Sequence, residues 1–233
     1  MIMTKRGPPA RKKPYGDPMS ISPQDACKRN RETCELAPIV PVLVVDNTAD
    51  ARPLAEALVA GGLPVLEVTL RTDAALEAIA EMAKVKGGIV GAGTLITPKD
   101  VENAVAAGAQ FGVSPGATDE LIAACEALGL PLLAGAATAS EAMQMLARGY
   151  DLLKFFPAEA SGGAKALKAI GAPLPQISFC PTGGVSLANA NDYLSLSNVI
   201  CAGGSWVAPK GLVAAGDWAE IEALARGASQ LGA

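Results

Sequence analysis

The sequence predicts an α/β protein in which short parallel strands alternate with helices. Two observations predict it: short apolar runs recur at regular intervals, and alanine-rich segments of helical period separate them. A length of 233 residues suits one such domain. No G-x-G-x-x-G pattern opens a helix after the first run, which disfavours an open doubly wound sheet. The expected architecture is therefore a closed (β/α)8 barrel, the TIM barrel, as a single domain over residues 20–233.

Eight apolar runs carry the strand prediction. Near-continuous apolar strands indicate a parallel sheet that is covered by helices. The runs are 39–45, 64–70, 89–94, 110–115, 131–136, 152–157, 177–182 and 199–206.

The segments between these runs predict helices, because their apolar residues return with a helical period. Threonines at the starts are good N-cap residues, and glycines at the ends suit a left-handed C-cap. The clearest helices are 49–60, 72–83, 99–107, 118–128 and 139–147, with starts at Thr97, Thr118 and Thr138 and ends at Gly61, Gly108 and Gly129.

The N-terminal residues differ in composition from the rest of the chain. Residues 1–19 are rich in Lys, Arg and Pro and predict a disordered basic tail, and Met19 could be the true start of translation. Residues 20–37 predict a short helix that covers the base of the barrel. The net charge of −4 argues against nucleic acid as a partner. No apolar run approaches the roughly 18 residues that span a membrane, and no signal peptide is visible, so we expect a cytoplasmic protein.

The chain has no histidine, which excludes Ser–His and Cys–His catalysis and removes the commonest metal ligand. Five cysteines without a C-x-x-C pair predict neither a disulfide framework nor a zinc site. Cys180 and Cys201 lie in strand-like runs and are expected to be small buried side chains. Proton transfer must then fall to carboxylates, Lys, Tyr, Cys or water.

Two charged residues interrupt buried strands. Lys154 has only apolar neighbours, and because burial lowers a lysine pKa, it is a candidate Schiff-base nucleophile. Glu67 lies in the second strand and is the leading candidate for proton transfer, with Tyr150 next. A purely structural ion pair between Lys154 and Glu67 is the alternative. Both interpretations predict that the two side chains meet.

Further candidates lie where strands end, which is where barrel enzymes place their chemistry. Arg71 follows the second strand and could grip a carboxylate with its two-pronged guanidinium, although simple solvation explains it equally well. Thr94 ends the third strand in Gly-Ala-Gly-Thr, where small residues let a ligand approach the backbone.

The last two strands end in glycine pairs. Loops after strands 7 and 8 of a barrel often bind phosphate through backbone N–H groups, so we expect a phosphate site here, with plain tight turns as the alternative. The residues concerned are Thr182, Gly183 and Gly184 after one strand and Gly203, Gly204 and Ser205 after the other.

The chain resembles the bacterial 2-keto-3-deoxy-6-phosphogluconate (KDPG) aldolases, a family that includes 4-hydroxy-2-oxoglutarate (KHG) aldolases. The resemblance runs from about residue 20 to the end. It rests on seven motifs in order: PVLVV at 41–45, LEVTLRT at 66–72, VGAGT at 90–94, VSPG at 113–116, KFFPAE at 154–159, FCPTGG at 179–184 and GGSW at 203–206.

The resemblance implies a class I aldolase of the Entner–Doudoroff pathway that needs no metal or other cofactor and forms a homotrimer. Its only expected partner besides itself is a phosphorylated 2-keto acid substrate. Lys154 would form the Schiff base and Glu67 would transfer protons. The other implied roles are carboxylate binding by Arg71 and Thr94, walls of the pyruvyl pocket from Pro115 and Phe156, and phosphate binding by Gly183, Gly184 and Ser205.

One departure concerns the fifth strand, where Ala134 stands in place of the family's usual proline. Alternatives also stay open. The preferred substrate could be the galactonate epimer or KHG. The chain could instead be a non-catalytic barrel that binds sugar phosphates, or an isomerase or epimerase on the same fold, which would need no buried lysine.

Overall fold

The structure is a computed structural model that describes residues 20–232. The predicted basic tail at 1–19, with the possible start at Met19, lies outside these residues. Short strands and helices alternate along the described chain. The strands are β1 (Ile39–Leu43), β2 (Val65–Thr69), β3 (Ile89–Gly93), β4 (Gly112–Val113), β5 (Leu132–Leu133), β6 (Gly135–Ala136), β7 (Leu152–Phe155), β8 (Ser178–Pro181) and β9 (Ala202–Gly204).

The strands form two parallel sheets. One has six strands in the order β5-β4-β3-β2-β1-β9, and the other has three in the order β6-β7-β8. Every strand pairing is parallel. The run predicted at 131–136 is divided into β5 and β6 at Ala134, which stands in place of the proline that is usual in the family this chain resembles. Two isolated parallel bridges, Phe179 to Val199 and Thr182 to Gly203, link the β8 region to the segment around β9.

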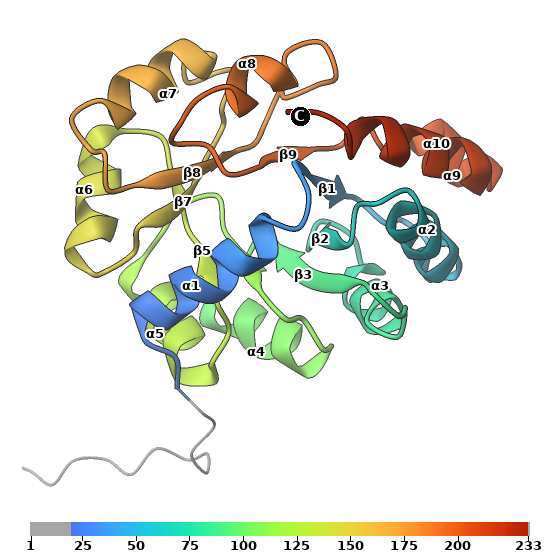
Figure 1. The fold of residues 1–233 in the computed structure, drawn as a ribbon. Helices are drawn as coiled ribbons and strands as arrows, with labels where there is room; N and C mark the ends of the chain where they lie inside the picture. The colour runs from blue at the N-terminus through green and yellow to red at the C-terminus, as the bar shows by residue number, and fades with distance from the viewer. Residues whose placement is uncertain (1–19, 233) are drawn as a thin grey trace, which may run out of the picture.

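Helices surround the strands, as Figure 1 shows. All residues of β2 and β7 are buried, including their charged ones, so these strands are covered on both faces as the apolar runs predicted. The α/β class with parallel strands is therefore confirmed. The helices are α1 (Pro23–Cys34), α2 (Thr48–Ala60), α3 (Ala75–Met82), α4 (Pro98–Ala106), α5 (Asp119–Leu128), α6 (Ala139–Ala147), α7 (Gly163–Gly171), α8 (Ala190–Leu194), α9 (Lys210–Ala215) and α10 (Trp218–Ala228).

The predicted helix starts are confirmed, since the hydroxyls of Thr97, Thr118 and Thr138 each accept a backbone N–H three residues on. At the helix ends the prediction is partly wrong. Gly129 caps α5 with φ 70°, but Gly61 caps α2 with φ −75°, outside the left-handed region. Packing explains the glycine at 61: a Cβ there would collide with the Cβ of Ala225 on α10, which packs against α2.

The predicted N-terminal helix is α1, and it lies across the ends of the strands (Figure 1). Arg31 donates from Nη1 to Ser178 Oγ at 3.0 Å and pairs through Nη2 with Asp151 Oδ1 at 3.3 Å. Asp151 and Ser178 stand at the amino-terminal ends of β7 and β8, so α1 covers the base of the sheets as expected. Within residues 20–232, no helix has both the length and the apolar character needed to cross a bilayer.

Candidate active site

The two charged residues predicted inside strands meet in the interior. Lys154 Nζ lies 3.2 Å from Glu67 Oε1, and the two residues are only 6% and 3% exposed. They belong to different sheets, Glu67 to β2 and Lys154 to β7. A buried ion pair is costly to desolvate, and replacing such a pair with apolar residues often stabilises a protein. The pair is therefore better explained by a catalytic role than by a contribution to stability. The short distance alone fits both the catalytic and the purely structural interpretation made from the sequence.

Small neighbours make room for the pair. In the strand registers Glu67 lies beside Gly91, and Lys154 lies between Gly135 and Cys180. A Cβ on Gly93 would collide with Glu67 Oε1. The Gly-Ala-Gly-Thr motif was expected to let a ligand approach the backbone. In the structure, the group that approaches Gly93 is the carboxylate of Glu67.

An aromatic ring also faces the lysine. Lys154 Nζ lies 5.2 Å from the ring centroid of Phe156, within cation–π range. Phe156 and Pro115 line the same cavity of about 160 Å³, as expected for two walls of one pocket. Its other lining residues are Gly116, Ala117, Gly135, Ala136, Ala137, Glu141, Gln144 and Met145, so it adjoins the ion pair without including it.

Arg71 and Thr94 are brought together just past the ends of β2 and β3. Arg71 Nε donates to Thr94 Oγ1 at 3.3 Å, and no carboxylate of residues 20–232 forms an ion pair with the exposed Arg71. Thr94 has φ 64°, and no other non-glycine residue in the described part of the chain has a positive φ. A β-branched residue is strained in this region, and such strain concentrates at functional sites. Thr94 directly follows Gly93, the residue that the Glu67 carboxylate approaches.

The predicted glycine loops follow β8 and β9. Gly183 and Gly184 have φ 98° and 82°, in the left-handed region that glycine tolerates. The backbone N–H groups of Gly184 and Ser205 donate no hydrogen bond to any residue of 20–232, so both are free to meet an anion. Thr182 and Gly203 join the two loops through a parallel bridge.

Close packing explains the glycines of the second loop. A Cβ on Gly203 would collide with Thr182 Oγ1, and a Cβ on Gly204 would collide with the ring of Trp206. Thr182 Oγ1 is buried without a hydrogen-bond partner among the described residues, so this hydroxyl stays available for a bound group.

All five cysteines are free and buried, and among them the predicted burial of Cys180 and Cys201 is confirmed. Burial raises the pKa of Cys125 to about 12. Near the ion pair, Cys201 donates to Cys180 at 3.5 Å, and this hydrogen bond lowers the pKa of Cys180 against the opposing effect of burial. Within residues 20–232, no three His, Cys, Asp or Glu side chains are grouped as metal ligands.

Tyr150, the second candidate for proton transfer, is excluded by its position. It precedes β7, whose other end carries Lys154. Its buried hydroxyl donates to Glu126 Oε1 at 3.2 Å, and burial raises its pKa. Sequence reasoning also missed Glu159 and Tyr193, which lie behind the glycine loop after β8. Glu159 is within the KFFPAE motif, and that motif was the only available signal.

Comparisons with known proteins identify the family of this chain. The family described as "KDPG and KHG aldolase" matches residues 31–224. A 2-dehydro-3-deoxy-phosphogluconate aldolase of Pseudoalteromonas atlantica is 54% identical over 190 residues, covering 81% of this chain and 88% of the relative.

Two solved structures extend the likeness to the fold. The KDPG aldolase of Zymomonas mobilis ZM4 with 3-phosphoglycerate superposes with a TM-score of 0.85 at 48% identity, covering 88% of this chain and 97% of that one. The KDPG aldolase of Legionella pneumophila, with pyruvate captured as a covalent carbinolamine, gives 0.83 at 45% identity, covering 86% and 98%.

Proposed function

Because this chain belongs to the KDPG and KHG aldolase family, we propose that it cleaves KDPG to pyruvate and D-glyceraldehyde 3-phosphate through a Schiff base on Lys154. The observation that carries this proposal is the buried contact between Lys154 and Glu67, with one ionisable nucleophile and one carboxylate 3.2 Å apart in an apolar interior. The carbinolamine of the Legionella relative is the intermediate that precedes such a Schiff base.

The chemistry starts with loss of a proton from Lys154, for which Glu67 is the nearest acceptor. The free amine attacks the C2 ketone, water leaves, and an iminium forms. The iminium accepts the electrons of the C3–C4 bond, so this bond breaks and leaves an enamine. A base takes the C4 hydroxyl proton, and glyceraldehyde 3-phosphate departs. C3 then gains a proton, and water releases pyruvate and restores the lysine. Glu67 is the proposed group for both proton transfers, directly or through a water.

The remaining residues bind the two ends of the substrate. Arg71 and Thr94 would hold the carboxylate, since Arg71 Nε donates to Thr94 Oγ1 and the Nη groups of Arg71 form no hydrogen bond within residues 20–232. Pro115 and Phe156 would enclose the pyruvyl portion. The phosphate would lie against the loops after β8 and β9, with Thr182, Gly183, Gly184, Gly203, Gly204 and Ser205 around it.

We also propose that the two sheets close into one (β/α)8 barrel over residues 20–233. Three observations support closure. Only Ala134 separates β5 from β6, and its carbonyl accepts a hydrogen bond from Lys154 N at 2.8 Å. The bridges around β8 and β9 join the other two edges. The Lys154–Glu67 contact joins the sheets across the interior.

Homotrimeric assembly, a cytoplasmic location and a place in the Entner–Doudoroff pathway are proposed from the family alone. Light scattering after gel filtration tests the assembly, and a monomer or dimer mass would contradict it. A side activity on KHG is proposed as well, because the matching family includes KHG aldolases.

The direct test of the function is reductive trapping. Borohydride added with pyruvate should attach a reduced pyruvyl group to the peptide that contains Lys154, located by mass spectrometry. Lys154→Met should show no adduct. Trapping at another lysine, or an unmodified wild-type protein, would overturn the assignment.

A metal test complements it. We expect cleavage to survive exhaustive chelation, because the iminium supplies the electron sink that a Lewis acid would otherwise provide. Loss of activity with EDTA that a divalent ion restores would contradict the mechanism.

A further inference from the structure

The glycine loop after β8 is held from behind by the segment that follows β7. Ala158 N donates to Thr182 O at 2.8 Å, and Glu159 N donates to Gly183 O at 3.0 Å. These two hydrogen bonds fix the carbonyl groups of Thr182 and Gly183. They leave the N–H of Gly184 without a partner among the described residues.

The side chain of Glu159 lies directly against the loop. A Cβ built on Gly184 would stand 2.6 Å from both Cβ and Cγ of Glu159, so the glutamate stem packs against this glycine. The Glu159 carboxylate accepts a hydrogen bond from the hydroxyl of Tyr193 on α8. Tyr193 is fully buried, so its ring cannot swing away without opening the packing.

Asn189, the N-cap residue of α8, holds the same loop at a second point. Asn189 Nδ2 donates to Gly184 O at 3.1 Å, and Asn189 Oδ1 accepts from Ser186 N at 2.7 Å. The loop is thus held directly by Asn189 and indirectly by Tyr193 through Glu159.

The direction of the Glu159 carboxylate matters because a negative charge that faces a phosphate site weakens phosphate binding. A carboxylate that points away from the site avoids this repulsion. The Glu159 carboxylate is directed to the Tyr193 hydroxyl, and both residues line a cavity of about 470 Å³, whose lining also includes Gly162, Gly163, Lys165, Lys168, Asn189 and Asp192. Burial and the neighbouring carboxylate raise the pKa of Tyr193, so its hydroxyl remains a donor across the working pH range.

We propose that Glu159 and Tyr193 form a brace that positions the Gly183–Gly184 loop and so sets the preference for phosphorylated over non-phosphorylated ligands. This inference rests on the proposed function. Both are positioning residues, since neither is expected to touch the reacting atoms. The physical reason is preorganisation: N–H groups bind an anion best when the protein already aims them at it.

The test compares phosphorylated substrate with pyruvate, which uses the same lysine and lacks the phosphate. Tyr193→Phe removes only the hydroxyl, Glu159→Ala removes the brace, and Glu159→Gln keeps an acceptor of the same shape. We expect the first two to raise KM for KDPG on the order of tenfold, the effect of one lost hydrogen bond. We expect kcat to be nearly constant and Glu159→Gln to stay close to wild type. Deuterium exchange of the pyruvate methyl group should be unchanged in all three.

Two controls keep the outcome clear. Ser195→Ala changes the lining of the same cavity without touching the brace and should leave KM unchanged. Melting temperatures identify variants that fail to fold, and Glu159→Gln then provides the folded reference. If wild type does not cleave KDPG, the proposed function fails. If wild type cleaves KDPG and Tyr193→Phe shows wild-type KM, or slows pyruvate exchange as much as cleavage, the brace is disproved.

Discussion

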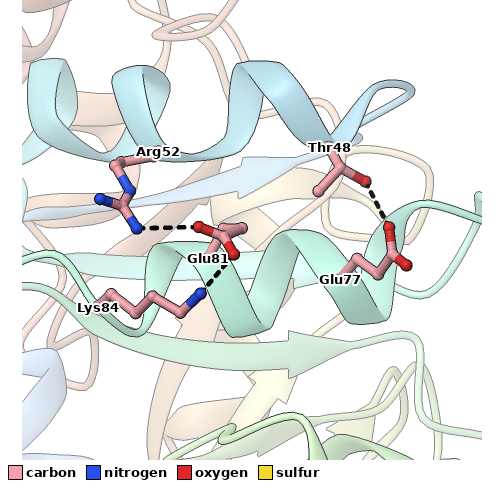
Figure 2. A network of polar contacts seen from close by, with 5 residues as sticks. All are labelled: Thr48, Arg52, Glu77, Glu81 and Lys84. Atoms are coloured by element: carbon pink, nitrogen blue, oxygen red, sulfur yellow. Dashed lines mark hydrogen bonds and ion pairs between the residues drawn. The ribbon is translucent and has the colours of Figure 1, made fainter.

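Lysine meets glutamate in two contrasting regions of this molecule. In the interior, Lys154 and Glu67 are paired at 3.2 Å with side chains only 7% and 4% exposed. On the surface, Glu81 of α3 contacts Lys84 and Arg52, and Figure 2 shows this network beside the Thr48–Glu77 hydrogen bond between α2 and α3. The Lys84 side chain there is 56% exposed.

The difference lies in what each pair costs. Surface charges keep most of their hydration, and such pairs contribute little to stability. Charges in the interior lose their hydration, and removing one partner leaves the other uncompensated. A surface pair therefore needs no functional explanation, whereas the interior pair does. Matched substitutions in the two regions test this reasoning.

The largest effect is expected for Lys154→Met compared with Lys84→Met. Loss of the nucleophile should reduce cleavage by roughly 10⁴-fold or more, while Lys84→Met keeps wild-type turnover. Steady-state assays coupled to pyruvate production measure both. Substantial turnover in folded Lys154→Met would place the Schiff base elsewhere. The interior variant should also unfold at lower denaturant, because Glu67 loses its partner at a cost of about 3–5 kcal/mol.

Glu67→Gln compared with Glu81→Gln should give the second effect. Cleavage by Glu67→Gln should slow by about 10²–10⁴-fold, the usual share of general acid–base catalysis. Pyruvate should still be trapped on Lys154, because the amine remains. Exchange of pyruvate methyl protons with deuterated water is the decisive measurement. Wild-type exchange with intact trapping would rule Glu67 out as the base at C3, and a bound water would then be the remaining candidate for that step, since Tyr150 lies at the opposite end of β7.

Ser205→Asp sharpens the comparison by placing a new charge on an exposed residue that faces the proposed phosphate. It should raise KM for KDPG on the order of tenfold through repulsion, with little effect on a non-phosphorylated 2-keto acid. Equal changes for both substrates would indicate that the glycine pairs serve only as turns. An exposed charge is thus expected to change KM when it lies beside the bound ligand.

The smallest effect is expected from the surface network itself. Hydrogen bonds from Lys84 and then Arg52 lower the pKa of Glu81 below its ordinary value. The stability that Glu81 contributes is therefore present above the ordinary carboxylate pKa and is lost as pH falls through the lowered one. Thermal unfolding of Glu81→Gln should match wild type in acid and differ slightly at neutral pH, and a large difference at neutral pH would contradict the contrast with the interior.

Sequence reasoning located the elements because their signals are local. The apolar runs, the threonine N-caps and the mixed-charge segment before the first strand each reflect the preferences of neighbouring residues. Lys154 is also recognised from local sequence, because it is a charged residue whose immediate neighbours are all apolar. Its importance could be suspected from four or five residues of sequence.

Tertiary structure decided which distant groups meet. Lys154 and Glu67 are 87 residues apart, and only strand register puts them on facing positions. The glycine at 61 was misinterpreted because its reason is the approach of Ala225, and Gly93 leaves room for Glu67; neither of these is a local neighbour. The contact between Glu159 and Tyr193 gave no sequence signal of its own. Local preference depends on a few adjacent residues, whereas close approach depends on how every element packs, and that is settled only when the chain has folded.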